Sequence, residues 1–187
     1  PIGLMLCTLA GADLFTGNTA YFIPPVMDKK LRVTALLRNW TLVYFGNFVG
    51  ALFVAYFMVT LTGVFAKSPW LESIYSIAEL KTSAPFYKVL LKGVGANWLV
   101  ALAMWLAYSA KDTTGKMLGI WFPVMAFVAI GYEHSIANMF FIPAAIFNGA
   151  PVGWGEFIFN NLIPATLGNI LGGSVLVGFL YWYVYRD

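Results

Sequence analysis

Hydrophobic residues fill long stretches of this chain, and polar residues gather in short segments between them. Each apolar stretch is at least as long as the roughly 20 residues that a helix needs to cross a bilayer. The pattern therefore predicts an all-α membrane protein, a single transmembrane domain over residues 1–187 with five spans joined by short polar loops. The spans are expected at residues 1–27, 39–66, 86–110, 117–147 and 160–184.

Composition agrees with this pattern and disfavours other classes of protein. The 187 residues are 60% hydrophobic and 10% charged, which is too little charge for a soluble domain of this length. The net charge of +3 comes from the loops, so it does not indicate nucleic-acid binding. One histidine and one cysteine cannot build a zinc or haem site of the usual kind. We expect no metal, no cofactor and no enzymatic activity.

Basic residues are unevenly distributed about the spans. Seven lie at alternate span ends and four lie on the other side. The positive-inside rule therefore predicts that the side with seven, which includes the C-terminus, is cytoplasmic. The seven are Lys29, Lys30, Arg32, Arg38, Lys111, Lys116 and Arg186, and the four are Lys67, Lys81, Lys88 and Lys92.

Two segments of the chain repeat the same motif. "ADLFTGNTAYFIPP" contains Asp13 and "YEHSIANMFFIPAA" contains Glu133; each acid is followed five residues later by an asparagine, Asn18 or Asn138, and then by Phe-Ile-Pro. "NWTLVYFGNFVG" and "NLIPATLGNILG" form a second matching pair at nearly the same offset. Two copies at one period indicate a duplicated unit.

The duplication predicts the topology of the protein. The first repeat covers about residues 1–66 and the second about 86–187, and the second begins with a span whose counterpart would precede Pro1. We therefore expect a complete protein of six spans, with two three-span repeats that face opposite ways across the bilayer. Glycines spaced four apart in each repeat predict close helix packing. They are Gly46, Gly50, Gly168 and Gly172.

The segments 1–27 and 117–147 each carry an acid and an asparagine at membrane depth, which predicts interrupted helices. Unwound backbone is tolerated there only where it is packed in protein or lines a polar cavity. We predict a non-helical turn at residues 16–18, with Asp13 capping the half-helix that follows. Glu133 is expected to hold the amides of the second break.

His134 is the candidate for chemistry because its imidazole changes charge near neutral pH. An ionisable group in a broken intramembrane segment is a functional candidate, although a histidine satisfied within a packed core is the alternative interpretation. Half-helix N-termini around the two breaks would add positive potential, which suits an anionic solute.

The runs "GADLFTGN", "GYEHSIANMFFIP" and "NLIPATLGNILGG" resemble the formate/nitrite transporter family, and bacterial formate channels most of all, over residues 1 to about 186. The resemblance implies a homopentamer of independent pores in a bacterial inner membrane. Each protomer would have an aquaporin-like six-helix inverted-repeat bundle with two broken helices, here lacking the first helix and the start of the second.

The same resemblance implies site residues. Thr16 and His134 would lie in the two helix-breaking loops and face the middle of the pore, and Gly17 stands where several formate channels have serine. Asn97 and Asn138 would form hydrogen bonds near this centre, Asp13 and Glu133 would hold the loops, and Lys81 would attract anions into a vestibule. The apolar constrictions on either side of the histidine would be formed by Leu4, Leu14, Phe15, Val100 and Phe127.

The function that this implies is passage of formate and related small weak-acid anions, by a channel or by a proton-coupled transporter. A charged solute in a dry apolar ring faces a penalty of several kcal/mol, so the hypothesis is that His134 lends the solute a proton while it crosses. Nitrite, lactate, acetate or hydrosulfide could use the same path. A non-transporting membrane enzyme or an assembly subunit is the alternative from a different class.

Overall fold

The computed structural model describes residues 1–186, which form helices, turns and connecting segments without a strand among them. The prediction of an all-α chain is therefore confirmed. The helices are α1 (Ile2–Ala10), α2 (Phe15–Tyr21), α3 (Ile23–Met27), α4 (Val33–Phe53), α5 (Trp70–Ser83), α6 (Phe86–Ser109), α7 (Thr113–Ala129), α8 (Ser135–Phe147), α9 (Ile163–Gly173) and α10 (Leu180–Tyr185). Three π-helical segments continue or precede them, namely η1 (Val54–Thr60), η2 (Glu156–Leu162) and η3 (Ser174–Phe179).

Among residues 1–186, three continuous helices are long and apolar enough to cross a membrane: Val33–Thr60, Phe86–Ser109 and Glu156–Tyr185. The span predicted at 39–66 is displaced, because Arg38 lies inside the helix rather than before it. A long aliphatic stem allows this, since it carries the guanidinium toward the polar boundary. At the other end, the chain turns at Gly63 (φ 71°) before the apolar run is complete.

The prediction of only short polar loops is wrong for residues 67–85, because α5 occupies most of this segment. Its buried residues Ile74, Ala78 and Thr82 are spaced four apart, which places them on one helical face. That face packs against α8 and η2. Amphipathic spacing was the available signal, and the charged residues in the segment obscured it.

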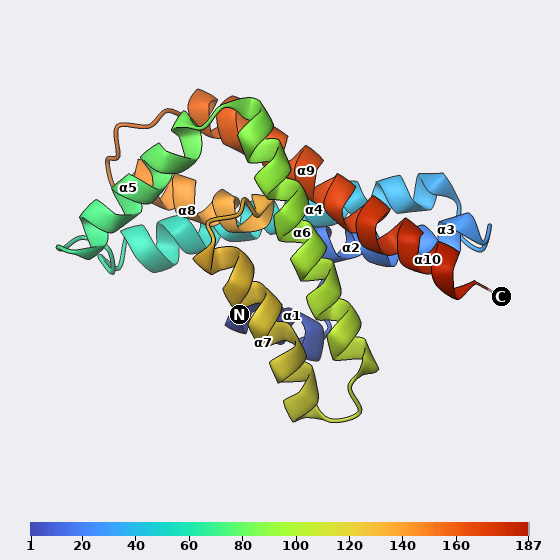
Figure 1. The fold of residues 1–187 in the computed structure, drawn as a ribbon. Helices are drawn as coiled ribbons and strands as arrows, with labels where there is room; N and C mark the ends of the chain where they lie inside the picture. The colour runs from blue at the N-terminus through green and yellow to red at the C-terminus, as the bar shows by residue number, and fades with distance from the viewer. Residues whose placement is uncertain (187) are drawn as a thin grey trace.

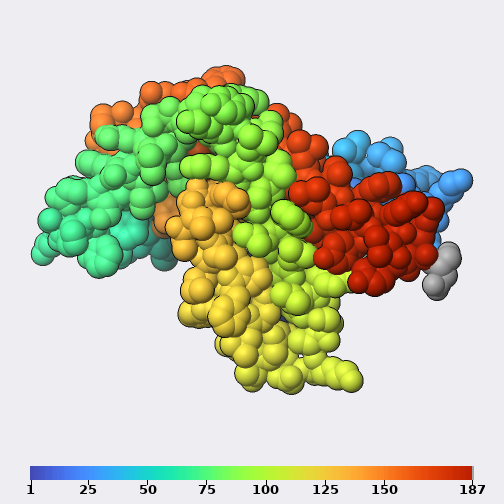
Figure 2. All heavy atoms as spheres, viewed as in Figure 1, coloured from blue at the N-terminus to red at the C-terminus, as the bar shows by residue number. Residues whose placement is uncertain are grey.

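The long helix α6 organises the molecule. It lies along α9 through the middle of the structure, and three groups of helices project from this pair (Figure 1). One projection holds α5 and α8, a second holds α1, α7 and the end of α6, and the third holds α3 and α10 (Figure 2). Two buried apolar clusters fill the first two projections. The helix breaks lie where these groups meet.

Glycines allow α6 and α9 to approach closely. A Cβ at Gly168 would overlap the carbonyl oxygen of Leu90, and one at Gly172 would overlap that of Val94. The predicted packing is thus confirmed in the second repeat. It is not seen in the first, because a Cβ at Gly46 or Gly50 would have no neighbour within 4 Å.

The segment after α3 and the helix α10 meet at one end of the molecule. Trp182 Nε1 donates to Asp28 Oδ1 at 2.7 Å, and Lys30 Nζ donates to Asp28 Oδ2 at 2.9 Å. These donors favour the carboxylate and so lower the pKa of Asp28 below its ordinary value. Above that ordinary value the contact keeps its full strength, and it weakens as the pH falls through the lowered pKa. Because Asp28 and Trp182 are in contact, the loop after α3 and the helix α10 lie at the same end of the molecule.

The glycine seam makes a testable prediction. Gly168→Ala should reduce the free energy of unfolding by about 1–3 kcal/mol, because the added methyl meets the backbone of α6, which cannot move aside as a side chain can. Thermal unfolding of the purified protein in detergent measures this. Gly155→Ala is the matched control, since a Cβ at Gly155 has no atom within 4 Å. Equal unfolding temperatures for the two variants would contradict the packing argument.

Candidate functional site

The two helix breaks have the same backbone geometry. Gly11 and Gly131 adopt left-handed φ values of 76° and 71°, which glycine tolerates best. Extended residues follow, and new helices start after Leu14 and His134, which are their N-caps. The predicted turn at residues 16–18 is therefore wrong, because Thr16 lies in the first turn of α2 and the break precedes it.

Two asparagines from the neighbouring long helices hold these breaks. Asn47 Oδ1 accepts a hydrogen bond from the Phe15 amide at 3.0 Å, and Asn169 Oδ1 accepts one from the Ser135 amide at 2.8 Å. Asn47 Nδ2 donates to the carbonyl oxygen of Asp13 at 3.2 Å. Asn169 Nδ2 donates at 2.9 Å to the carbonyl oxygen of the acid at the equivalent position in the second break. The prediction that Asp13 caps the half-helix is wrong, because Asn47 binds that amide instead.

The acids of the breaks bind side-chain amides rather than backbone amides, which corrects the predicted contact of Glu133. In the second break, Glu133 Oε2 accepts from Asn138 Nδ2 at 2.7 Å and from Asn161 Nδ2 at 3.1 Å. In the first, Asn18 Nδ2 donates to Asp13 Oδ1 at 2.9 Å. The recurrence of these bonds at equivalent positions supports the predicted duplication.

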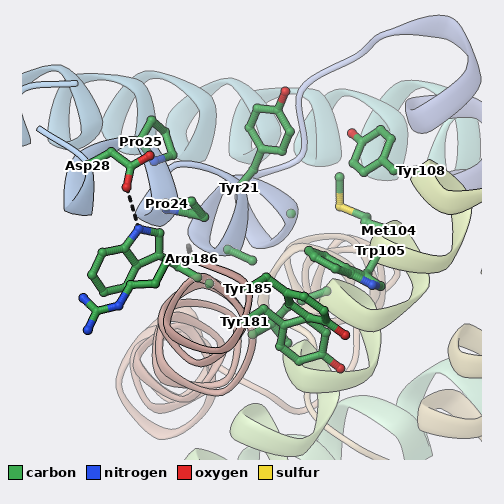
Figure 3. A pocket seen from close by; sticks show the side chains of 16 residues that line it. Tyr21, Pro24, Pro25, Asp28, Met104, Trp105, Tyr108, Tyr181, Tyr185 and Arg186 are labelled. Atoms are coloured by element: carbon green, nitrogen blue, oxygen red, sulfur yellow. Dashed lines mark hydrogen bonds between the residues drawn. The ribbon is translucent and has the colours of Figure 1, made fainter. Parts of the chain in front are cut away.

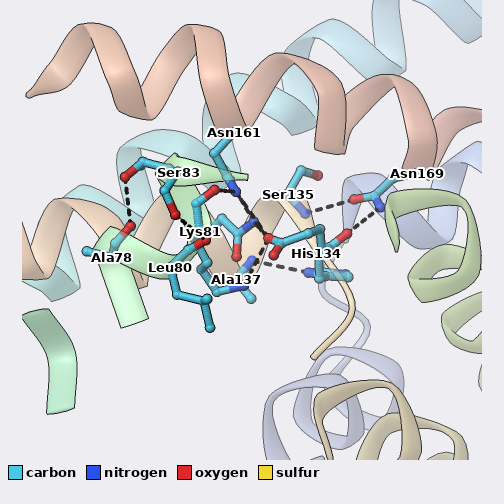
Figure 4. Close-up of polar contacts among 12 residues, drawn as sticks. Ala78, Leu80, Lys81, Ser83, His134, Ser135, Ala137, Asn161 and Asn169 are labelled. Atoms are coloured by element: carbon cyan, nitrogen blue, oxygen red, sulfur yellow. Dashed lines mark hydrogen bonds and ion pairs between the residues drawn. The ribbon is translucent and has the colours of Figure 1, made fainter. Parts of the chain in front are cut away.

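Lys81 also binds the acid of the second break. Its Nζ lies 2.9 Å from Glu133 Oε2, and the two side chains are 16% and 5% exposed. Figure 4 shows Lys81 and Asn161 converging on the segment that leads into α8. Lys81 was predicted in a loop, but it lies on α5 and is ion-paired. Attraction of anions by Lys81 stays a prediction.

His134 and Thr16 meet across the two breaks. His134 Nδ1 accepts a hydrogen bond from the Ala137 amide at 3.1 Å, and because an amide N–H can only donate, Nδ1 carries no proton. The neutral ring then has its proton on Nε2, which lies 2.9 Å from Thr16 Oγ1. Thr16 is fully buried and His134 is 7% exposed. The ring of Phe127 stacks on the imidazole, with centroids 5.6 Å apart.

Asn97 joins α6 to this centre. Its Nδ2 lies 3.0 Å from the Thr16 carbonyl oxygen, 2.8 Å from Thr19 Oγ1 and 2.6 Å from the Asn169 carbonyl oxygen. Asn97 is fully buried, and its Oδ1 has no partner among the described residues. The structure thus brings Asn97 to Thr16, whereas Asn138 lies with Glu133 on the Lys81 side.

Four of the five predicted constriction residues come together. Leu4, Val100 and Phe127 belong to one buried cluster, and Leu14 packs against it. Phe15 lies elsewhere: its ring makes edge contacts with Trp40 and Tyr44 of α4. That these residues narrow a pore stays a prediction.

The family model for formate/nitrite transporters matches residues 1–183 of the chain. The chain belongs to the formate/nitrite transporter family. It is 47% identical to the "Probable formate transporter" of Methanothermobacter thermautotrophicus, over 99% of this chain and 72% of that protein. It is 44% identical to the formate channel BtFdhC of Bacillus thuringiensis, over 100% of this chain and 71% of that one.

A solved structure described as a pentameric formate channel with formate bound is similar throughout. Its TM-score is 0.84 at 34% identity, and the match covers 99% of this chain and 80% of that chain. The family consists of integral membrane transporters rather than enzymes, so the alternative of a membrane enzyme is excluded. The predicted family and fold are confirmed.

Sequence reasoning missed the asparagines that hold the breaks. Asn47 and Asn169 belong to the second repeated motif, which indicates the duplication and, through its glycines, close helix packing, but which assigns no role to the asparagines. An uncharged amide recurring in two membrane spans was the signal that could have found them, since such a group must bond inside the protein.

The Lys81–Glu133 pair makes a testable prediction. Lys81→Met should reduce the free energy of unfolding by about 3 kcal/mol, because it leaves a buried carboxylate without its counter-charge. Adding Glu133→Gln should recover much of this loss, since the amide oxygen still accepts from Asn138 and Asn161. Unfolding of the four proteins of this double-mutant cycle in detergent measures the coupling. Additive losses would show that the pair is not coupled.

Proposed function

We propose that this protein moves formate across a membrane, along a path that runs past the side chains of Thr16 and His134. The observation that carries the proposal is the 2.9 Å contact of these two side chains, one from the first turn of α2 and one from the N-cap of α8, in a protein of this family. Relatives and a similar solved structure are named for formate, which supports formate as the first substrate.

Electrostatics explains why a titratable ring suits this position. An anion that leaves water for an apolar ring has a desolvation penalty of several kcal/mol, whereas the neutral acid avoids most of it. The apolar cluster around Leu4, Val100 and Phe127 lies beside His134, so a solute on this path meets the ring and the apolar wall together. The N-terminus of α8 adds favourable potential for an anion.

Proton exchange at His134 is coupled to the cap of α8. In the neutral ring, Nε2–H faces Thr16 and the lone pair of Nδ1 accepts from Ala137. A second proton can therefore bind only when the ring gives up the Ala137 amide. The imidazolium formed in that way transfers one proton to a carboxylate oxygen, and the neutral ring returns to the cap. The protein is a symporter if the proton leaves with the solute and an anion channel if it returns to His134.

We further propose a homopentamer in a bacterial inner membrane, with the C-terminus in the cytoplasm. The pentameric state of the similar formate channel supports the assembly. The excess of basic residues in the loops on the side of Asp28 and Arg186 supports the orientation, and the bond between Asp28 and Trp182 places that loop and α10 together.

Transport by reconstituted protein tests the function. Proteoliposomes should take up formate faster than protein-free liposomes at two pH values, measured by stopped flow, and nitrite and lactate in parallel give the order of preference. Light scattering coupled to size-exclusion chromatography should show five copies. Equal solute leakage with and without protein would refute transport.

Two substitutions remove the titration of His134, and each keeps a different one of its structural contacts. His134→Gln keeps a side-chain donor near Thr16, and His134→Asn keeps an N-cap for α8. Both remove titration, so both should abolish proton movement with formate while the pentamer still assembles. Formate uptake recorded with a pH-sensitive dye inside the vesicles measures this. Unchanged pH dependence of uptake in both variants would contradict a proton-exchanging histidine.

A further inference from the structure

Two cavities flank α2 where it faces α6. The larger, of about 620 Å³, lies between α2, α3, α6 and α10 (Figure 3). The smaller, of about 220 Å³, is lined by α1, by the first break and by α2 and α6, and Leu4 and Leu14 form part of its wall. Tyr21, Met104 and Tyr108 line both cavities, so they form the partition between them.

Met104 is the flexible member of this partition, and it rests on Gly17. A Cβ at Gly17 would overlap the sulfur of Met104 and lie 2.9 Å from its terminal methyl carbon. Because Gly17 has no side chain, the tip of Met104 can sit directly against the backbone of α2 at this residue. Figure 3 shows Met104 reaching from α6 between Tyr21 and Tyr108.

This contact lies directly beside the site. Gly17 follows Thr16 in the chain, and both are buried. The smaller cavity leads to Leu14, the residue at which the first break ends. An unbranched thioether changes its rotamer easily, and the larger cavity behind it provides room. Met104 also packs against the apolar cluster that contains Phe127, whose ring stacks on His134. The tip of Met104 is therefore a movable part of the apolar wall near the Thr16–His134 pair.

We propose that Met104, seated against Gly17, sets the largest weak acid that this protein admits. The proposal rests on the transport function proposed above and adds a size-determining residue to it. A one-carbon acid passes with the tip of Met104 on Gly17. A three-carbon acid needs the tip to move toward the larger cavity. A side chain at residue 17 displaces the tip from its seat and into the path.

The experiment compares formate and lactate uptake by proteoliposomes at one pH. Met104→Ala should raise the ratio of lactate to formate uptake by roughly tenfold, the scale on which one methylene-sized difference in an apolar pocket discriminates. Gly17→Ala should lower this ratio. The double variant should match Met104→Ala, because the new methyl then has no tip to displace. Met104→Leu, which keeps an apolar side chain that is branched and reaches one bond less far, should give an intermediate ratio.

The outcomes are distinguishable. Met58→Ala is the matched control, since Met58 is 49% exposed on η1, and it should keep the wild-type ratio. A wild-type ratio in both single variants overturns the proposal, as does a Gly17→Ala effect that persists unchanged in the double variant. If Met104→Ala fails to assemble by size-exclusion chromatography, Met104→Leu carries the test. Wild-type protein that transports neither acid would refute the proposed function, whereas formate transport with an invariant ratio refutes only this inference.

Discussion

The structure depends on one constraint: backbone that is unwound at membrane depth must find its hydrogen-bond partners inside the protein. Each break leaves amide and carbonyl groups that no helix satisfies, and a lipid environment offers no water to replace the missing bonds. Asn47 and Asn169 meet this need with one donor and one acceptor each. Because each asparagine side chain binds a carbonyl oxygen before the new helix and a backbone amide at its start, it fixes the shape of its break.

The glycine seam and the asparagines act together. Gly168 and Gly172 bring α9 against α6, and this close approach lets Asn169 Nδ2 also reach the carbonyl oxygen of Gly93 at 2.8 Å. The same approach places Asn97 on the carbonyl oxygen of Asn169. A wider helix spacing would leave these polar groups buried without partners, at about 1–3 kcal/mol each. Close packing is therefore a condition for the polar centre.

Charge around the site is balanced rather than concentrated. Glu133 precedes His134 in the chain, but Lys81 and two asparagine amides bind its carboxylate. The imidazole is thus left with Thr16 and Ala137 as its polar contacts and with Phe127 on its face. The imidazole of His134, for which we propose proton exchange, therefore lies between the backbone amide of Ala137 and the apolar ring of Phe127.

The amino-acid sequence alone determined that this is an all-α membrane protein with a duplicated unit and two interrupted spans, because hydrophobic length and repeated motifs are properties of the chain itself. It also singled out His134, since the single histidine of the chain lies in such a span and its charge changes near neutral pH. Only the tertiary structure decided where the first break lies, because Asn47, which fixes it, is remote in sequence. The ion pair of Lys81 with Glu133 and the seat of Met104 on Gly17 likewise join separate helices, and no local pattern specifies a contact that packing alone creates.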